Sequence, residues 1–194
     1  MQAVAWFRMA AERGHSESQA SLAEIYLNGS GVPRDLLKGV FWLRKAAEQG
    51  HRWAQWDLGR MHAIGEGVPK DAAQAVVWYR KAAEQGYPDA QYNLGVKYAN
   101  GEGVPKDAVQ AVTWYRKAAE QGYADAQSNL GAKYAEGVGV PKDFILSYMW
   151  RNLAAAQGNE IAKTAREALE KDMTPAQIAE AQKLSREWKP KVTK

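Results

Sequence analysis

The feature that most constrains the fold of this chain is a repeat that recurs every 36 residues. Residues 65–87 and 101–123 lie that far apart and differ at only two positions. Three residue types keep the same interval, namely Trp6, Trp42, Trp78, Trp114 and Trp150, then Gly14, Gly50, Gly86, Gly122 and Gly158, and then Pro33, Pro69, Pro105 and Pro141. A fixed period of this size, unbroken by insertions, predicts one array of stacked structural repeats.

Each repeat has the pattern of two helices joined by short turns. In the third repeat, Ala90, Leu94 and Tyr98 fall on one face of a first helix, because they are spaced four residues apart. A glycine-rich turn follows, and Asp107 is a favourable N-cap for a second helix. No segment has the pattern of a strand. We therefore predict an all-α fold with helix pairs at 18–28/35–49, 54–64/71–85, 90–100/107–121 and 126–136/143–157.

Small residues recur where the predicted helices should meet. Gly59, Gly95 and Gly131 lie inside first helices, where glycine costs about 1 kcal/mol relative to alanine. The second helices carry adjacent alanines at 46–47, 82–83, 118–119 and 154–155. We expect close helix contact to compensate for the glycines, and tryptophans to fill the remaining space.

The repeats share the pattern A-x3-L-G-x2-Y-x2-G-x-G-V-x2-D-x3-A-x2-W-x3-A-A-x2-G. This pattern resembles the Sel-1-like repeat family, a relative of the tetratricopeptide repeats. The third repeat matches at Ala90, Leu94, Gly95, Tyr98, Gly101, Gly103, Val104, Asp107, Ala111, Trp114, Ala118, Ala119 and Gly122. The fourth repeat has Ser147 in place of alanine, the second has His62 in place of tyrosine, and the first departs at Ser18, Ala23 and Gly39.

The resemblance implies a right-handed superhelical α-solenoid of helix-turn-helix repeats, used as a protein-binding scaffold. It covers residues 1 to about 162, so we divide the chain into a half repeat at 1–16 (a second helix only), four repeats at 17–162, and a degenerate repeat with a capping helix at 163–194. Thr174 and Gln177 have the spacing of a capping box at the start of that helix. We expect the closing residues KPKVTK to form a frayed basic tail.

No residue pattern indicates an enzyme, a cofactor or a metal site. The chain has no cysteine, and His15, His51 and His62 lack the spacing of zinc ligands. We expect the first two to be turn-forming surface residues and His62 to be a packing residue. The segment GEGVPKD lacks the lysine and hydroxyl spacing of a phosphate loop. No apolar run reaches the roughly 20 residues of a membrane span. The first residues also lack a signal-peptide pattern, and because the chain begins within a repeat we interpret it as a fragment of unknown cellular location.

The formal net charge of +4 raises the possibility of a nucleic-acid partner. The recurring basic pairs at 44–45, 80–81 and 116–117 are, however, each followed within one helical turn by Glu48, Glu84 or Glu120. Pairs of this spacing are typical of a solvated helix face. We therefore expect a protein or peptide partner and no nucleic acid.

Candidate binding residues are those at positions whose residue type differs from repeat to repeat while the shared pattern stays constant. In tetratricopeptide-like solenoids the first helices line the concave groove, so variation there favours partner contact. The candidates are Trp53, Trp56, Asp57, Arg60, Tyr92, Asn93, Lys97, Asn129 and Lys133. Exposed tryptophan, tyrosine and arginine are typical interface anchors. Trp56 and Tyr92 hold equivalent positions and are predicted to be neighbours, although Trp53 and Trp56 could instead pack between repeats.

Two Asn–Lys pairs suggest what the groove recognises. Asn93 and Lys97 are four residues apart, as are Asn129 and Lys133, so each pair projects from one helix face. Lysine supplies charge and asparagine supplies directed donors, a combination that suits a carboxylate. It resembles the carboxylate clamp of certain tetratricopeptide domains in residue type and spacing. The predicted ligand is an acidic or C-terminal peptide across the second to fourth repeats.

The favoured function is a non-enzymatic scaffold that binds a protein or peptide in its concave groove. The alternative is a structural or regulatory repeat segment of a larger protein, and a hydrolase is a third hypothesis that rests only on analogy with cysteine-rich relatives. The half repeat also predicts end-to-end self-association, because Ala3, Trp6 and Ala10 would lack a covering helix.

Overall fold

The computed structural model describes residues 2–191, which contacts divide into two compact units. Unit 1 contains the residues up to Ala90 together with Glu102–Val104. Unit 2 contains Gln91–Gly101 and the residues from Pro105 onward. The boundary between them falls inside helix α6 (Pro88–Asn100), so each unit is described separately.

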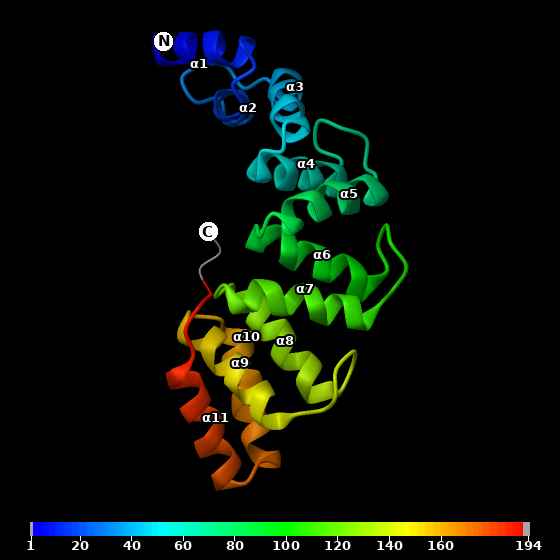
Figure 1. Ribbon diagram of the computed structural model, residues 1–194, viewed down its shortest axis with the longest axis vertical. Helices are drawn as coiled ribbons and strands as arrows, with labels where there is room; N and C mark the ends of the chain where they lie inside the picture. Colours follow the sequence, from blue (N-terminus) through cyan, green and yellow to red (C-terminus); the bar gives the residue numbers. More distant parts are fainter. Residues whose placement is uncertain (1, 192–194) are drawn as a thin grey trace. The chain divides into compact units, whose positions relative to one another are not determined.

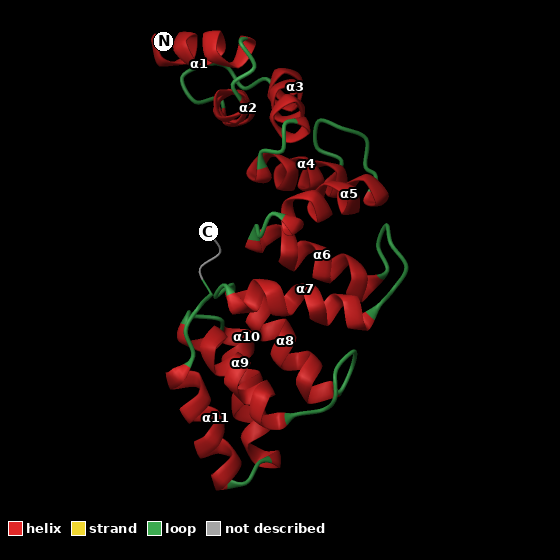
Figure 2. Cartoon of the chain, viewed as in Figure 1, coloured by secondary structure: helices red, strands yellow, loops and turns green. Residues whose placement is uncertain are grey.

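The described residues form α-helices, one 3-10 turn and connecting loops, with no strand in this part of the chain (Figures 1 and 2). The helices are α1 (Gln2–Glu12), α2 (Ser16–Asn28), α3 (Leu36–Glu48), α4 (Arg52–Ile64), α5 (Ala72–Glu84), α6 (Pro88–Asn100), α7 (Ala108–Glu120), α8 (Ala124–Glu136), α9 (Phe144–Ala156), α10 (Glu160–Leu169), the turn η1 (Glu170–Asp172) and α11 (Pro175–Glu187). Successive helices pair within each repeat, which confirms the predicted all-α solenoid of helix pairs.

The first helices of the repeats begin two residues earlier than predicted, because the residue after each repeat glycine is an N-cap. His15, His51 and Tyr123 all adopt the extended backbone conformation at this position. The ring of His15 accepts a hydrogen bond from the backbone N–H of Ser18, and the ring of His51 accepts one from Ala54. The two histidines therefore terminate turns, as predicted, and also satisfy free donors at the helix starts.

The second helices are capped by the predicted aspartates, which are Asp35, Asp71, Asp107 and Asp143. Each accepts a hydrogen bond from a backbone N–H of the first helical turn, a contact worth about 1 kcal/mol. In unit 1 the loop of the third repeat also packs closely at Gly103, which has a φ of +75°. A Cβ atom there would collide with the carbonyl oxygen of Ala72, so the position requires glycine.

The core of unit 1 is built from small residues that let the helices approach closely. Helix α2 packs on α3 and α4 packs on α5. Leu43, Leu58 and Met61 are fully buried among alanines of these helices. At Gly59 an added Cβ atom would lie 2.8 Å from the Cδ1 of Tyr79, so the helical glycine makes room for an aromatic ring. This confirms the expected close contact at the first of the three helical glycines.

Unit 2 repeats the same packing. A Cβ atom at Gly95 would lie 2.7 Å from the Cδ1 of Tyr115, and one at Gly131 would lie 2.8 Å from the Cγ of Arg151. The side chain of Ser147, which replaces the pattern alanine, is fully buried and its hydroxyl donates a 2.7 Å hydrogen bond to the carbonyl of Gly131. The fourth repeat therefore accommodates its one departure from the pattern by pairing the added polar group.

The tryptophans of the repeat do not all fill core space. Trp114 and Trp150 are buried, whereas Trp42 and Trp78 are half-buried and Trp6 is 70% exposed. The ammonium of Lys81 lies 4.2 Å from the ring centroid of Trp78, and that of Lys117 lies 4.0 Å from the ring centroid of Trp114. These lysines therefore cover aromatic faces three residues before them.

Paired glutamines connect neighbouring helix pairs inside each unit. Four glutamines near the starts of first helices are buried, namely Gln19, Gln55, Gln91 and Gln127. Each accepts a hydrogen bond of 2.6–2.9 Å from a glutamine 30 residues later, the donors being Gln49, Gln85, Gln121 and Gln157. The amide of Gln127 in turn donates to the carbonyl of Ala119 at 3.1 Å, and Gln19 and Gln55 make the equivalent bond. The buried amides are thus satisfied by the partner glutamines and by backbone carbonyls.

The C-terminal helix α11 begins with the predicted capping box, and the tail that follows it is bound at its start. Thr174 and Gln177 form both hydrogen bonds of a capping box at the start of α11. Beyond the helix, the backbone N–H of Lys191 donates a 2.7 Å hydrogen bond to the carbonyl of Glu120, and the two side chains form an ion pair of 2.9 Å. The predicted basic tail is therefore fixed on α7 as far as Lys191, and its last residues, 192–194, lie outside the described part of the chain.

Candidate functional site

In unit 1, the aromatic candidates lie on α4 and are half-buried. The ring centroid of Trp56 lies 5.8 Å from that of Tyr87, at an interplanar angle of 55°. Trp53 packs on the core of the unit and meets His51 edge-on, with centroids 6.2 Å apart. Both tryptophans therefore take part in packing while leaving part of each ring accessible, a result between the two alternatives that the sequence left open.

The charged candidates of unit 1 form an internal network. Arg60 pairs with Asp57 at 2.7 Å and with Glu66 at 3.3 Å, and Glu66 also pairs with Arg34 at 2.8 Å. Asp57 is only 5% exposed, so it is not the surface residue that the sequence pattern indicated. Burial alone would lower the pKa of Arg60, but its hydrogen bonds and charge interactions with Asp57 and Glu66 raise it. Arg60 is thus held in one position, with part of its guanidinium accessible.

In unit 2, a cluster of aromatic residues surrounds Asn129. The ring centroid of Tyr92 lies 6.0 Å from that of Tyr115 and 5.2 Å from that of Tyr123. Burial raises the pKa of Tyr92, and the charge of Asp125 raises it further, whereas a hydrogen bond with Asn129 lowers it. Burial also raises the pKa of Tyr115 to about 12, again opposed by a hydrogen bond with Asn129. The Asn129 amide therefore lies near both tyrosine hydroxyls.

The two predicted lysines of unit 2 differ in their surroundings. Lys133 forms an ion pair with Glu136 at 3.0 Å, and its side chain is 23% exposed. Asn93 and Lys97 are half-buried on α6, and each has an interaction within the chain. All four Asn and Lys candidates thus belong to the first helices of one unit, α6 and α8. The further prediction that Trp56 neighbours Tyr92 concerns two different units and stays a prediction.

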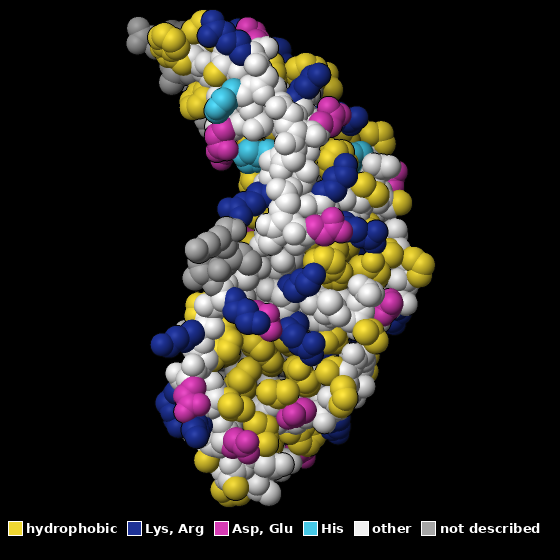
Figure 3. Space-filling view, viewed as in Figure 1, with side chains coloured by type: hydrophobic (Ala, Val, Ile, Leu, Met, Phe, Trp, Pro, Cys, Tyr) yellow, Lys and Arg dark blue, Asp and Glu magenta, His cyan; other side chains and the backbone are white. Residues whose placement is uncertain are grey.

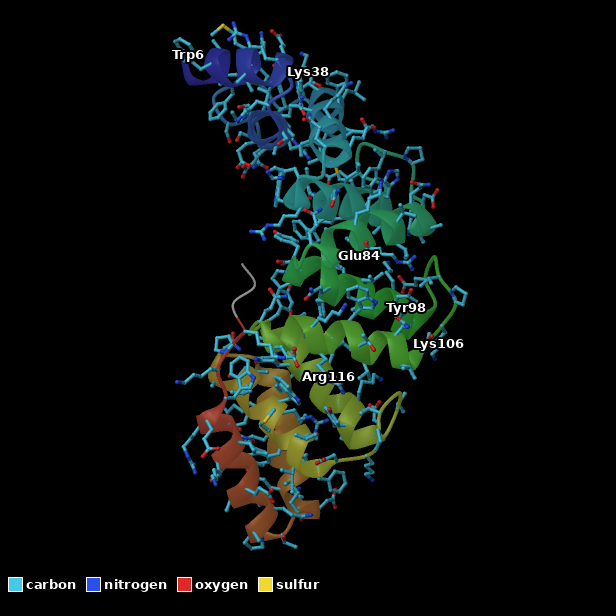
Figure 4. The ribbon with its side chains drawn as sticks, in the orientation of Figure 1. Trp6, Lys38, Glu84, Tyr98, Lys106 and Arg116 are labelled. Carbon is cyan, nitrogen blue, oxygen red and sulfur yellow. The ribbon has the colours of Figure 1, made fainter. Side chains whose placement is uncertain are left out.

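An apolar surface lies at the first helix of unit 1. Trp6 lies on α1 (Figure 4) and is 70% exposed, and Met9 is also exposed. These residues, with Ala10 and Arg13 among others, line a cavity of about 480 Å³. The side chain of Ala3, which the sequence also predicted to be uncovered, lies outside the described residues.

Other kinds of site have little support in the described part of the chain. No group of three His, Cys, Asp or Glu residues there could hold a metal ion. None of the described helices is both long and apolar enough to cross a bilayer. His62 is buried and bonds to the carbonyl of Pro69 at 3.3 Å, in keeping with its predicted packing role. Figure 3 shows basic, acidic and apolar side chains interspersed on the face in view.

Two sets of contacts around the candidates were not anticipated from the sequence. Arg34 and Glu66, which complete the network of Arg60, are 32 residues apart and meet only because two loops of successive repeats lie together. Tyr115 and Tyr123, which flank Tyr92, recur only in the preceding repeat, as Tyr79 and Tyr87. They lie outside the shared repeat pattern, which therefore does not indicate that they contact Tyr92.

Comparison with known proteins supports the interpretation of the repeats. The family model of the Sel1 repeat matches residues 1–15, 16–51, 54–87, 88–123 and 124–159. Among curated proteins, no match is found.

Several solved structures are similar to this chain. One is c5321, a protective antigen present in uropathogenic Escherichia coli strains, which displays an SLR fold. It is 39% identical in sequence with a TM-score of 0.86, and the match covers 96% of this chain and 40% of c5321. Another is a Sel1 repeat protein from Oxalobacter formigenes, 40% identical with a TM-score of 0.80, over 86% of this chain and 48% of that one. The immunity protein Pa5087 from Pseudomonas aeruginosa is 25% identical with a TM-score of 0.53, over 96% of this chain and 71% of that one. The chain therefore spans less than half the length of the first two.

Proposed function

Because the chain belongs to the Sel1 repeat family, we propose that it binds a protein or peptide partner on the first helices of its repeats and catalyses no reaction. Proteins of this family are generally protein-interaction scaffolds. The observation that carries the proposal is the row of half-buried polar and aromatic residues on α6 and α8, where the rings of Tyr92, Tyr115 and Tyr123 pack together near Asn129. Aromatic side chains held by their neighbours can bind a ligand at a lower cost in conformational entropy.

The chemistry of this row favours a carboxylate ligand. Lys97 and Lys133 supply two positive charges, and Asn93 and Asn129 supply amide donors. Tyr92 lies near Asn129 and offers apolar ring surface to the side chains of a bound peptide. The ligand is therefore an acidic segment or the C-terminus of a partner chain.

The ion pair between Lys133 and Glu136 must be broken or shared when such a ligand binds, and this lowers the free energy gained on binding. A carboxylate that contacts Lys133 must compete with Glu136, which accepts at 3.0 Å. Pairs at the surface contribute only about 0.2–1 kcal/mol, so an incoming carboxylate that also meets the asparagine amides can displace Glu136. The same competition should make binding weaken as the salt concentration rises.

Unit 1 offers a second set of contacts. Trp53, Trp56 and Arg60 each keep part of their surface accessible while being held by neighbours. Tryptophan and arginine dominate the energetics of many interfaces. We assign these three residues to partner binding by unit 1, and we assign Asp57 the role of positioning Arg60.

The test is a titration of the full chain with an acidic peptide that ends in a free carboxylate, compared with the same peptide carrying a C-terminal amide. Lys97→Ala and Lys133→Ala should each weaken binding of the free acid. Lys106→Ala is the matched control, because Lys106 lies exposed in the loop after α6 (Figure 4). Equal binding by all three variants and the wild type, with no dependence on salt, would overturn the assignment of the ligand. It would leave the alternative, a spacer or regulatory segment of a larger protein.

The exposed apolar surface on α1 supports a further proposed contact, with a second copy of the chain. Trp6 and Met9 expose their side chains beside a cavity that polar residues only partly line. Exposed apolar surface of this kind promotes association. The proposal predicts concentration-dependent self-association through this end of unit 1.

A further inference from the structure

The segment after α11 is bound in a groove between the second helices of two neighbouring repeats, α7 and α9. The indole of Trp188 meets that of Trp150 edge-on, with centroids 6.1 Å apart. Trp188 and Pro190 also approach Gly122, where a Cβ atom would lie 3.8 Å from each. Lys191 then reaches Glu120 at the end of α7, by the main-chain bond and the ion pair described above. Figure 1 shows this segment leaving α11 and running to the end of α7.

The periodicity of the chain places an equivalent groove between α1 and α3. Three periods of 36 residues before Trp150, Gly122 and Glu120 lie Trp42, Gly14 and Glu12. These three residues line one cavity of about 560 Å³, together with Phe41, Lys45 and Glu48 among others. The groove that is filled in unit 2 by the chain itself is therefore present in unit 1 as an open cavity.

The tryptophan of this groove lacks the lysine cover that two of its equivalents have. Trp78 and Trp114 are each covered by the ammonium of the lysine three residues later, at 4.2 and 4.0 Å from the ring centroid. The corresponding lysine near Trp42 is Lys45, but its ammonium lies over Phe41, 5.8 Å from that ring centroid. Trp42 is half-buried, meets Phe41 edge-on with ring centroids 5.0 Å apart, and borders the cavity.

We propose that the groove between α1 and α3 binds an extended segment of a partner polypeptide that carries an aromatic residue and, three positions later, a lysine. This is the spacing of Trp188 and Lys191, the pair that fills the equivalent groove. The aromatic ring packs on Trp42, as Trp188 packs on Trp150, and the lysine pairs with Glu12, as Lys191 pairs with Glu120. This site lies on the second helices and is independent of the function proposed above.

The charge of the groove agrees with this occupant. Glu12 and Glu48 both line it, whereas the position equivalent to Glu48 in unit 2 is Ala156. The open groove therefore holds one more carboxylate than the filled one, but Lys45 in place of Leu153 adds a cation that offsets it, so Glu12 remains the partner for one basic residue. The ammonium of Lys45 can lie over the ligand ring as related lysines lie over Trp78 and Trp114.

The experiment uses the full chain and a fluorescein-labelled peptide with blocked ends and the sequence of residues 187–191, EWKPK, measured by fluorescence anisotropy. We expect saturable binding with a Kd below about 1 mM. Glu12→Lys should weaken it by about fivefold or more, because it reverses the charge that pairs with lysine. Replacing the last peptide lysine by glutamate should weaken binding to the wild type and restore it on the Glu12→Lys chain. Circular dichroism confirms that the variant is folded, since Glu12 is exposed.

Glu120→Lys is the matched control, because it alters the groove that the chain fills itself. The proposal predicts that it changes peptide affinity less than twofold, on the scale of a weak surface interaction. If Glu120→Lys abolishes peptide binding and Glu12→Lys leaves it unchanged, the peptide only displaces the chain's own tail from α7, and the proposal is overturned. Absence of saturation would overturn it too. A rise in molecular mass with concentration that Glu12→Lys abolishes would support the groove and identify the segment as that of a second copy.

Discussion

Replacing Gln127 with leucine should destabilise unit 2 even though it makes the core more apolar. The Gln127 side chain is fully buried, accepts a hydrogen bond from Gln157 at 2.9 Å and donates one to the carbonyl of Ala119 at 3.1 Å. Leucine has a similar volume but can make neither bond. The substitution thus isolates the contribution of the glutamine pair from that of packing.

The expected loss of stability follows from the surroundings of the two groups that lose a hydrogen-bond partner, the carbonyl of Ala119 and the amide of Gln157. The carbonyl of Ala119 would keep the 2.9 Å hydrogen bond that it accepts from the backbone N–H of Gly122, so losing the amide donor costs about 0.5–1.5 kcal/mol. The amide of Gln157 is on an exposed residue and can turn to water, so its loss adds only about 0.5–1 kcal/mol. We expect a total of about 1–2.5 kcal/mol, which for a chain of this size lowers Tm by roughly 2–10 °C.

The assay is urea unfolding followed by circular dichroism, with the midpoint converted to free energy at constant slope. Gln157→Leu is the matched control and should cost about 1 kcal/mol, because it leaves the bond from Gln127 to Ala119 intact. The double variant should cost less than the sum of the two, since the singles share one hydrogen bond. A loss below about 0.5 kcal/mol for Gln127→Leu, or equal losses for both singles, would refute the reasoning.

Three further substitutions and one titration test other parts of the structure. Gly95→Ala should lower the free energy of unfolding by about 1–3 kcal/mol in urea melts, because the new methyl meets the ring of Tyr115, whereas a gain would refute the packing argument. The pKa values of Tyr79 and Tyr115 in the folded chain are raised to about 12 from an ordinary 10, so the stability that is present below pH 10 should be lost between pH 10 and 12. Absorbance at 295 nm, about the phenolate maximum, follows the ionisation, and a pKa near 10 for both tyrosines in the folded chain would contradict this prediction. Trp188→Ala should cost about 1–3 kcal/mol and expose the groove beneath it, which thermal melts and acrylamide quenching of tryptophan fluorescence can measure. Trp6→Glu should abolish any concentration-dependent increase in mass seen by light scattering, and a wild type that stays monomeric would count against association through α1.

The helices and their packing could be predicted from the sequence because every repeat has nearly the same residue pattern. The spacing of Asp107 from the glycine-rich turn located its second helix, and the structure confirms that cap. The glycine inside the first helix, Gly95, indicated a close approach that Tyr115 in fact makes. Agreement among several copies turns a weak local signal into a strong one, because an accidental match would not recur in register.

Other features depended on contacts that periodicity does not specify. Gln55 and Gln85 recur with the 36-residue period, but glutamine is mostly exposed in proteins, and the hydrogen bond between the two allows the first to be buried. Lys81 could by spacing pair with a glutamate ahead of it or cover Trp78 behind it, and the structure shows the second contact. Asp57 occupies a variable position, so variation suggested exposure, but the arginine one turn later holds it inside.

The glutamine pairs bear on how such a gene can change its length. Each pair joins residues 30 apart, and both partners recur with the 36-residue period, as Gln19 with Gln49 and Gln55 with Gln85 show. Recombination between the nearly identical stretches 65–87 and 101–123 would insert or remove one whole period. Every glutamine near the junction would then meet an identical partner at the same distance along the chain. The array can therefore gain or lose a repeat in one genetic event without having to evolve a new interface.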